Sequence, residues 1–352
     1  MRKILPLNVD VGITTECWTL YRLSAILTNN KYYPWYYERF INLTMVDNCE
    51  VVYYPTYFGN YHYRIIENQF IYDEVLNYKL IDYRNKGIVD AIIKGINNGW
   101  YSLIDYNRFF IEGDQRYLKE NSYHDVIICG YDMKDEIFYC FDYNLRNIQI
   151  GIQTIKFDQL EKAFLSSIKY HRKIGEYSQY CENLPATFIR PDNRFEREVC
   201  LGRILDTLVN YMNSHNIEII TKEKNFSIRK GISIYKGYYQ DLYERLLDNE
   251  NYFSNNALPL FRIKTVEESK KGILTRMNYL MANKYICFNE NELQEKLNKI
   301  TNKMELVFSI MSKFYYTHDK GLLMRTNEIW HQIENLDENF TCECINIIRR
   351  CI

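Results

Sequence analysis

Three residues in the first half of the chain have the types and settings that nucleophilic catalysis requires. Cys17 follows Thr14-Thr15-Glu16, and the two threonines are good N-caps for a helix predicted over residues 16–29. A thiolate is favoured in the first turn of a helix, because the helix dipole and the unbonded N–H groups of that turn stabilise negative charge. Cys17 is therefore the candidate nucleophile.

A histidine and an aspartate stand on two strand-like segments further along the chain. His124 lies at the start of the segment 123–132, and Asp142 ends the segment 137–142. The β-branched and aromatic residues of both segments predict strands, and the short turn between them predicts an antiparallel pair. In that pair His124 is expected to act as general base and Asp142 to orient its ring. Each residue alone has a common structural explanation, but the ordered set favours catalysis.

The surrounding pattern predicts an α+β fold in which the helix carrying Cys17 packs on an antiparallel sheet carrying His124 and Asp142. Further strands are expected at 51–54, 100–106 and 148–155, and further helices at 87–96 and 157–166. Pro185 and Pro191 bracket a predicted linker. From residue 192 the pattern is helical throughout, and apolar residues between 293 and 314 recur at helical spacing, which predicts a bundle core. Two domains follow, 1–180 and 192–352.

Composition narrows the classes of partner. The 352 residues include 44 basic and 45 acidic side chains, a net charge of -1, so no global field favours nucleic acid or an anionic membrane. The chain has no run of eighteen apolar residues and no signal-like N-terminus, which predicts a cytoplasmic protein without a membrane span. The ten cysteines contain no CxxC pair, so a structural zinc site is not expected. Nucleotide-binding glycine motifs are also absent.

The motifs resemble a known family. Segment 100–142 resembles the histidine region of C39-type, papain-like cysteine peptidases, where His leads a strand ending in Gly-Tyr-Asp and the next strand ends in the Asp. The helix start at Thr14-Thr15-Glu16-Cys17 resembles their nucleophile region. With a helical second half, the arrangement is similar to the butirosin acyltransferase family and to the cysteine-protease-like amide-forming enzyme of closthioamide biosynthesis. The resemblance spans residues 1–170 and is confined to short motifs.

This resemblance implies an acyltransferase of thiotemplated, nonribosomal antibiotic biosynthesis. Such an enzyme takes an acyl group from a carrier-protein thioester and passes it to an amine, forming an amide. Cys17, His124 and Asp142 would form the catalytic triad. The implied partners are an acyl or peptidyl carrier protein and a small-molecule amine. No cofactor and no metal are implied beyond the phosphopantetheine that arrives on the carrier.

One departure from papain-like peptidases concerns the oxyanion hole, the group of donors that stabilises the tetrahedral intermediate. Those peptidases place a Gln a few residues before the Cys, and residues 8–16 contain none. The backbone N–H of Cys17 supplies one donor, and the second stays open between Asn8 and a threonine hydroxyl. A thioester needs less oxyanion stabilisation than an amide, so the missing Gln favours thioester substrates.

Two alternatives remain. A C39-type peptidase would use the same triad, and a catalytically silent binding or scaffold protein would make the triad a coincidence. For the acyltransferase, the aromatic stretches 32–63 and 100–123 are expected to line a narrow pantetheine channel, although aromatic core is their commoner use. A basic patch at Lys264, Lys270 and Lys271 is the expected docking point for an acidic carrier.

Overall fold

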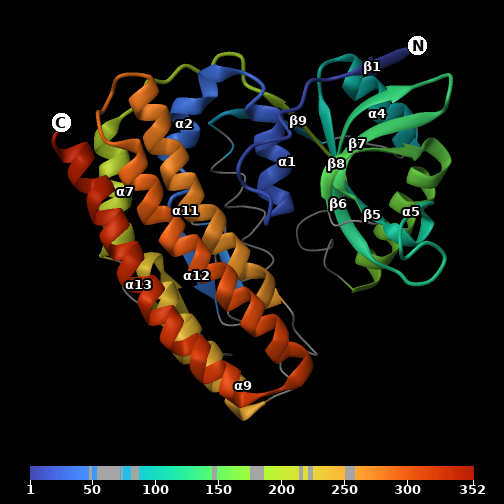
Figure 1. Ribbon diagram of the computed structural model, residues 1–352. Helices are drawn as coiled ribbons and strands as arrows, with labels where there is room; N and C mark the ends of the chain where they lie inside the picture. Colours follow the sequence, from blue (N-terminus) through green and yellow to red (C-terminus); the bar gives the residue numbers. More distant parts are fainter. Residues whose placement is uncertain are drawn as a thin grey trace. The chain divides into compact units, whose positions relative to one another are not determined.

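The computed structural model describes residues 1–46, 50–53, 72, 74–80, 87–144, 149–174, 186–213, 217–220, 225–249 and 258–352. The chain forms two compact units (Figure 1), Met1–Tyr32 with Gln69–Glu196, and Tyr33–Asn68 with Arg197–Ile352. This division differs from the boundary expected near residues 180–192, because Tyr33–Asn68 belongs to the second unit although it precedes most of the first in the sequence. No helix of the described ranges is both long and apolar enough to cross a membrane.

The first unit is built on an antiparallel sheet. Its strand order is β4 (Leu76–Leu80), β9 (Ala186–Pro191), β5 (Tyr101–Asn107), β6 (Tyr123–Asp132), β7 (Ile137–Asn144) and β8 (Gln149–Lys156), and β1 (Arg2–Ile4) also pairs with β6. All of these pairs are antiparallel. The α+β class and the strands expected between residues 100 and 155 are confirmed, with ends that differ by a few residues.

Strand β9 corrects the linker predicted between Pro185 and Pro191. It lies inside the sheet, between β4 and β5. Ala186, Phe188 and Ile189 have no exposed surface, so burial of these side chains makes the stretch a core strand. Pro191 is the last residue of the strand, a position where its missing N–H interrupts no interior ladder.

Among the described residues, the longer helices of the first unit are α1 (Cys17–Ile26), α4 (Gly87–Asn97) and α5 (Phe157–Ile174). Apolar residues of α4 and α5 form one core with the sheet, including Ile92, Phe164 and Val126, each fully buried. The close approach of α4 to β9 requires a glycine, because a Cβ atom on Gly95 would clash with the ring of Phe188. This core holds the strands that carry the candidate site.

The second unit is mostly helical. Its longer helices are α7 (Leu201–Met212), α11 (Leu258–Ala282), α12 (Glu290–Thr317) and α13 (Lys320–Arg349), and the short helix α2 (Tyr33–Glu38) belongs with them. Figure 1 shows α11, α12 and α13 running side by side. The apolar stripe predicted along α12 is confirmed as core, because its members are all buried: Leu293, Leu297, Ile300, Met304, Val307, Ile310 and Phe314.

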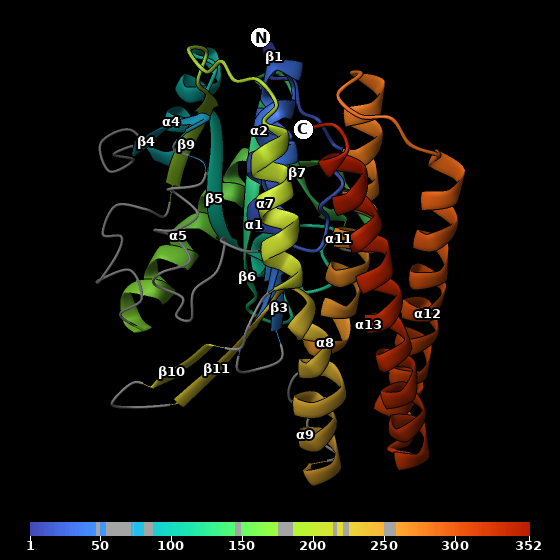
Figure 2. The same cartoon turned by 90° about the vertical axis from the view of Figure 1, so that its left-hand side faces the viewer.

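A small sheet in this unit corrects the prediction that the chain is helical throughout after residue 192. Its order is β10 (Ile217–Ile220), β11 (Asn225–Lys230), β2 (Leu43–Val46) and β3 (Glu50–Tyr53), and Figure 2 shows the β10–β11 hairpin. The isoleucines of the segment 217–220 favour a strand. The partner strand β2 lies far earlier in the sequence, so local helical periodicity could not predict the pairing.

The lysines predicted to form a docking patch do not form one. Lys270 has no exposed surface, and its Nζ lies 2.8 Å from the carboxylate of Asp337. Lys264 and Lys271 both contact Glu267, at 2.7 and 2.6 Å. Because Lys270 is buried and the other two lysines share one carboxylate, the three side chains do not form the exposed positive patch that was expected to attract an acidic partner.

The sequence predicts that two aromatic stretches, 32–63 and 100–123, line a channel. Trp35, Tyr37 and Phe40 are buried in the second unit, and Tyr37 stacks on Tyr279 at a ring distance of 4.3 Å. These side chains are packed core, which is the commoner use of aromatic residues. Residues 54–63, the rest of the first stretch, lie outside the described residues. In the second stretch, Tyr101 and Tyr106 are buried as well.

Candidate active site

Helix α1 begins at Cys17. Glu16 is the N-cap residue in extended conformation, and it directly follows the predicted caps Thr14 and Thr15. The first intrahelical bond runs from Leu20 N to Glu16 O at 2.8 Å, so the amide of Cys17 is one of the first-turn N–H groups that have no acceptor within the helix. Cys17 is half-buried. Its sulfur therefore stands where the helix terminus stabilises negative charge.

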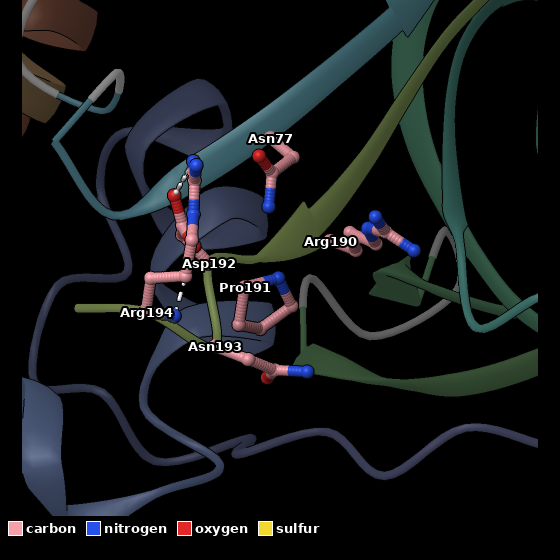
Figure 3. A pocket seen from close by; sticks show the side chains of 6 residues that line it. All are labelled: Asn77, Arg190, Pro191, Asp192, Asn193 and Arg194. Atoms are coloured by element: carbon pink, nitrogen blue, oxygen red, sulfur yellow. Dashed lines mark hydrogen bonds and ion pairs between the residues drawn. The ribbon is translucent and has the colours of Figure 1, made fainter.

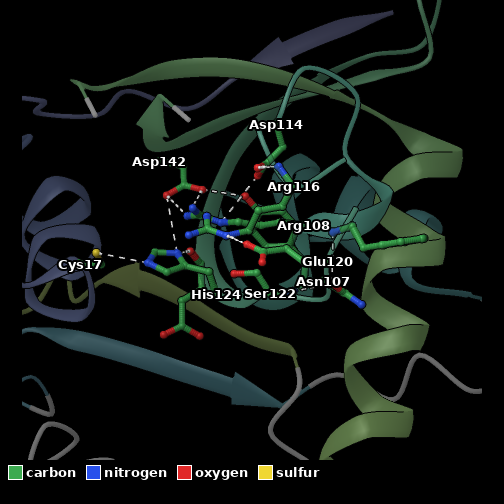
Figure 4. Close-up of polar contacts among 12 residues, drawn as sticks. Cys17, Asn107, Arg108, Asp114, Arg116, Glu120, Ser122, His124 and Asp142 are labelled. Carbon is green, nitrogen blue, oxygen red and sulfur yellow. Dashed lines mark hydrogen bonds and ion pairs between the residues drawn. The ribbon is translucent and has the colours of Figure 1, made fainter. Parts of the chain in front are cut away.

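The structure brings Cys17 and His124 together. The Sγ atom of Cys17 lies 3.6 Å from Nε2 of His124 (Figure 4), within the range of a sulfur hydrogen bond. His124 is the second residue of β6 and lies directly opposite Tyr106 of β5. The sheet thus presents the imidazole to the start of α1, which is the arrangement that a thiol nucleophile and its base require.

The second ring nitrogen of His124 identifies the tautomer. Nδ1 lies 2.7 Å from the backbone carbonyl oxygen of Asp125. A carbonyl oxygen only accepts hydrogen bonds, so Nδ1 must carry the proton. In the neutral ring Nε2 then has the lone pair, and that lone pair faces the Cys17 thiol. The ring is prepared to accept the thiol proton.

Asp142 lies near the imidazole but not in hydrogen-bonding contact with it. Its Oδ1 is 3.7 Å from Nδ1 of His124. At this end of the β6–β7 ladder the terminal pair is Ile127 with Phe141. Continued by one residue, this register places Asp142 opposite Val126 and diagonal to His124, so the two side chains share one face at more than direct cross-strand distance.

A β-bulge in β6 produces this alignment. Ile128 pairs with Cys140 and Gly130 with Tyr139, which leaves Cys129 as an extra residue in β6. Without the extra residue, the pairing of Gly130 with Tyr139 would continue unchanged along both strands and place Asp142 opposite Ile127. The Asp142 side chain would then lie on the other face of the sheet from His124. The extra residue shifts the register by one and turns the carboxylate toward the base.

Three side chains that sequence reasoning missed donate hydrogen bonds to Asp142. The hydroxyls of Tyr21 and Tyr106 reach Oδ1 and Oδ2, each at 2.7 Å. Nη2 of Arg108 lies 3.4 and 3.3 Å from the same two oxygens. Asp142 is only 1% exposed, so these donors supply the compensation that a buried carboxylate needs. The one available signal was Tyr21, which stands four residues after Cys17 and thus on the same face of the helix.

Burial and charge act together on the ionisable groups. Burial lowers the pKa of His124, the Arg108 guanidinium lowers it further, and Asp142 opposes both by raising it. Burial, reinforced by Asp142, holds the pKa of Tyr21 and Tyr106 well above the ordinary phenol value. Both phenols are therefore protonated donors toward Asp142, and the imidazole is favoured in its uncharged form.

Asn8 is not positioned as an oxyanion donor. Its side-chain amide donates to the carbonyl oxygen of Leu27 at 3.1 Å, just past the C-terminal end of α1, whereas Cys17 begins that helix. In the described part of the chain no cluster of three or more His, Cys, Asp or Glu residues is arranged to hold a metal ion.

A separate hollow of about 410 Å³ lies at the ends of β4 and β9 (Figure 3). Its lining residues are Asn77, Arg190, Pro191, Asp192, Asn193 and Arg194. The carbonyl of Asp192 accepts a hydrogen bond from Tyr32, a residue that follows the C-terminal end of α1. The hollow includes none of the three predicted site residues.

Comparison with known proteins gives little further information. No family model matches the chain, and no curated protein matches it. Among solved structures, a crystal structure of a C39-like peptidase candidate from Bacillus anthracis has 15% sequence identity and a TM-score of 0.27, over 55% of this chain and 99% of that chain. A TM-score this low supports no functional assignment, so the case for a function rests on the geometry of the site.

Proposed function

We propose that this protein is a cysteine-dependent acyltransferase in which Cys17 forms an acyl-enzyme from a thioester and an amine then takes the acyl group as an amide. One observation carries the proposal. The Sγ atom of Cys17, at the start of a helix, lies 3.6 Å from a ring nitrogen of His124 whose partner nitrogen donates to the Asp125 carbonyl. A thiol, a base with its lone pair toward that thiol, and an orienting acceptor are the parts of a nucleophilic acyl-transfer site.

In the first half-reaction, Nε2 of His124 removes the Cys17 proton while the sulfur attacks the thioester carbonyl. The tetrahedral intermediate collapses with cleavage of the substrate C–S bond, and the imidazolium returns its proton to the departing pantetheine thiol. While it exists, the imidazolium lies 3.7 Å from the Asp142 carboxylate, which stabilises its charge. The backbone N–H of Cys17, in the first turn of α1, is the proposed donor to the developing oxyanion.

The second half-reaction releases the acyl group. A neutral amine attacks the carbonyl of the acyl-enzyme, and His124 accepts the proton that the amine loses. The C–S bond to Cys17 breaks, the sulfur regains its proton from the imidazolium, and an amide leaves. Protons and electrons balance without any further reactant.

The choice of a thioester over a peptide rests on the oxyanion donors. Residues 8–16 contain no Gln, and the side chain of Asn8 is bonded near the far end of α1. Losing one oxyanion donor costs about 2.7–4 kcal/mol of transition-state stabilisation where this has been measured. A thioester tolerates that loss better than an amide, because its carbonyl is more electrophilic and a thiol leaves more readily. The proposed donor is an acyl or peptidyl carrier protein, and the proposed acceptor is a small-molecule amine.

The test offers the purified protein two substrate sets in parallel: an acyl pantetheine thioester with a primary amine, and a panel of peptides. We expect amide formation that depends on both thioester and amine, without peptide cleavage, and no product from Cys17→Ala. Peptide hydrolysis without any amine-dependent product would instead identify a peptidase. No acyl adduct on Cys17 from either set would leave only a binding or scaffold role.

A further inference from the structure

We propose that Arg108 is a positioning residue that holds Asp142 away from the imidazole of His124 and keeps the Cys17–His124 pair uncharged in the resting protein. This inference rests on the proposed function, because a role in catalysis for Arg108 requires that Cys17 and His124 are catalytic. It concerns the protonation state of that same pair. It does not depend on which acyl donor or acceptor is used.

The first observation is that the Asp142 carboxylate is held by donors other than the imidazole. Arg108, on the short turn η2 (Arg108–Phe110), contacts both carboxylate oxygens, and the Tyr21 and Tyr106 hydroxyls bind one oxygen each. Both ions of the pair are buried, at 6% and 1% exposure. Donors on both oxygens draw the carboxylate toward Arg108, which leaves Nδ1 of His124 at 3.7 Å and bonded to a backbone carbonyl instead.

The second observation concerns the charged groups around His124. Charged and polar groups from five elements surround the imidazole or act on its charge. They are Cys17 and Tyr21 from α1, Asp105 and Tyr106 from β5, Arg108 from η2, Asp125 from β6 and Asp142 from β7. Asp105 lies 2.5 Å from the His171 ring and 2.8 Å from the Ser167 hydroxyl, so those groups compete for its charge. Arg108 balances Asp142, and Asp114 lies behind Arg108 at 4.0 Å.

Position decides which protonation state this balance favours. Arg108 lies on the far side of the imidazole from Cys17 (Figure 4). A positive charge in that place repels an imidazolium more strongly than it attracts a thiolate on the opposite side of the ring, since Coulomb energy falls with distance. Cys17 therefore rests as a thiol, and its proton moves to His124 only as the substrate carbonyl is attacked.

Replacing Arg108 by Gln should convert the site to a charged pair. Asp142 would then face His124 without a compensating cation, the imidazolium would be favoured, and the thiolate population would rise. Removal of one adjacent unit charge shifts a side-chain pKa by about one unit or more. We therefore expect iodoacetamide to alkylate Cys17 about tenfold faster in Arg108→Gln than in the unsubstituted protein at about pH 6. Mass spectrometry of the peptide that contains Cys17 measures the rate of alkylation.

Two further variants distinguish the effect of the positive charge at residue 108 from a general disturbance of the fold. Arg108→Lys keeps a cation at the same place and should retain the slow alkylation profile. Arg116→Gln removes an arginine of the same segment whose side chain pairs with exposed Glu120, and it should leave the profile unchanged. An Arg108→Gln protein that is alkylated no faster than the unsubstituted protein across the acidic range would overturn the proposal.

The unsubstituted protein provides a test that does not require the variant to fold. ¹⁵N spectra of its histidine rings, assigned with His124→Gln, should show the neutral Nδ1–H tautomer at neutral pH. An imidazolium signal at that pH would contradict the proposal. Neither measurement uses an acyl donor, so a failure of the amide-forming assay and a failure of the Arg108 proposal give separate results.

Discussion

The hydroxyl of Tyr21 donates a hydrogen bond to Oδ1 of Asp142 at 2.7 Å, and this contact joins the helix that carries Cys17 to strand β7. The same hydroxyl lies 3.2 Å from the carbonyl oxygen of Asp125, which is the acceptor for Nδ1 of His124. Tyr21 therefore touches both groups that surround the base. Because it stands one helical turn after Cys17, it also fixes the nucleophile relative to them.

Tyr21→Phe should weaken both the fold and the site. The variant loses a buried hydrogen bond to a charged group, so we expect the free energy of unfolding in urea to fall by about 1.5–3 kcal/mol. We also expect slower acylation of Cys17, because α1 is no longer tied to Asp142. Tyr131→Phe is the matched control, since it loses a 2.8 Å bond to Asn97 in the same unit and should lower stability only. Equal acylation rates in the two variants would show that Tyr21 serves stability alone.

Cys17→Ala should abolish turnover and leave the fold intact, because a half-buried first-turn residue contributes little core packing. Intact-protein mass spectrometry after incubation with an acyl thioester should detect an adduct on the unsubstituted protein and none on the variant. Cys200→Ala, which removes another half-buried thiol, should still form the adduct. An adduct of equal yield on Cys17→Ala would assign the nucleophile elsewhere.

His124→Ala and Asp142→Asn should differ in severity. His124→Ala removes the base and should eliminate nearly all turnover. Asp142→Asn should cost clearly less than the drop of about 10⁴ seen where an aspartate alone sets the histidine tautomer. The physical reason is that the Asp125 carbonyl already holds Nδ1 at 2.7 Å. The measurement is kcat/KM. If Asp142→Asn is as inactive as His124→Ala, the carboxylate and not the carbonyl orients the ring.

Local sequence patterns predicted the parts of the site that depend on local structure. The helix start at Cys17 and strands β6 and β7 follow from capping and strand-forming residues, and all three lie within a few residues of the expected positions. The apolar spacing of α12 likewise predicted its buried face. These features depend on neighbours in sequence, which periodicity and capping report directly.

Long-range pairing was beyond those patterns. The bulge at Cys129, which turns Asp142 toward His124, leaves no mark on the alternation of apolar residues. Arg108 follows a strand and has no sequence feature that predicts its contact with Asp142. The two prolines at 185 and 191 predict a linker, whereas pairing with β4 and β5, which lie many residues earlier, makes the stretch a core strand. In each case the interaction that decides the structure joins segments that are distant in sequence, so a local sequence pattern cannot predict it.

The buried pair of Lys270 and Asp337 should dominate the stability of the second unit. Both side chains have no exposed surface, and Asp337 also accepts hydrogen bonds from the hydroxyls of Tyr211 and Tyr235. Lys270→Met leaves a buried carboxylate without its cation, which costs about 3–5 kcal/mol. Lys271→Met removes a half-exposed lysine and should cost at most about 1 kcal/mol. Urea unfolding curves of similar midpoint for the two variants would contradict this assignment.

The pH dependence of acylation should reflect the lowered pKa of His124. Burial lowers this pKa from its ordinary value of 6.5, and Arg108 lowers it further. The catalytic form is the neutral ring, so activity should persist as the pH falls below 6.5 and disappear only as it passes through the lowered pKa. We expect the acidic limb of kcat/KM to lie below 6.5 and the exposed-histidine control His331→Gln to keep it in place. A limb at or above 6.5 would mean that Asp142 outweighs burial and Arg108, and the pair would then rest as thiolate and imidazolium.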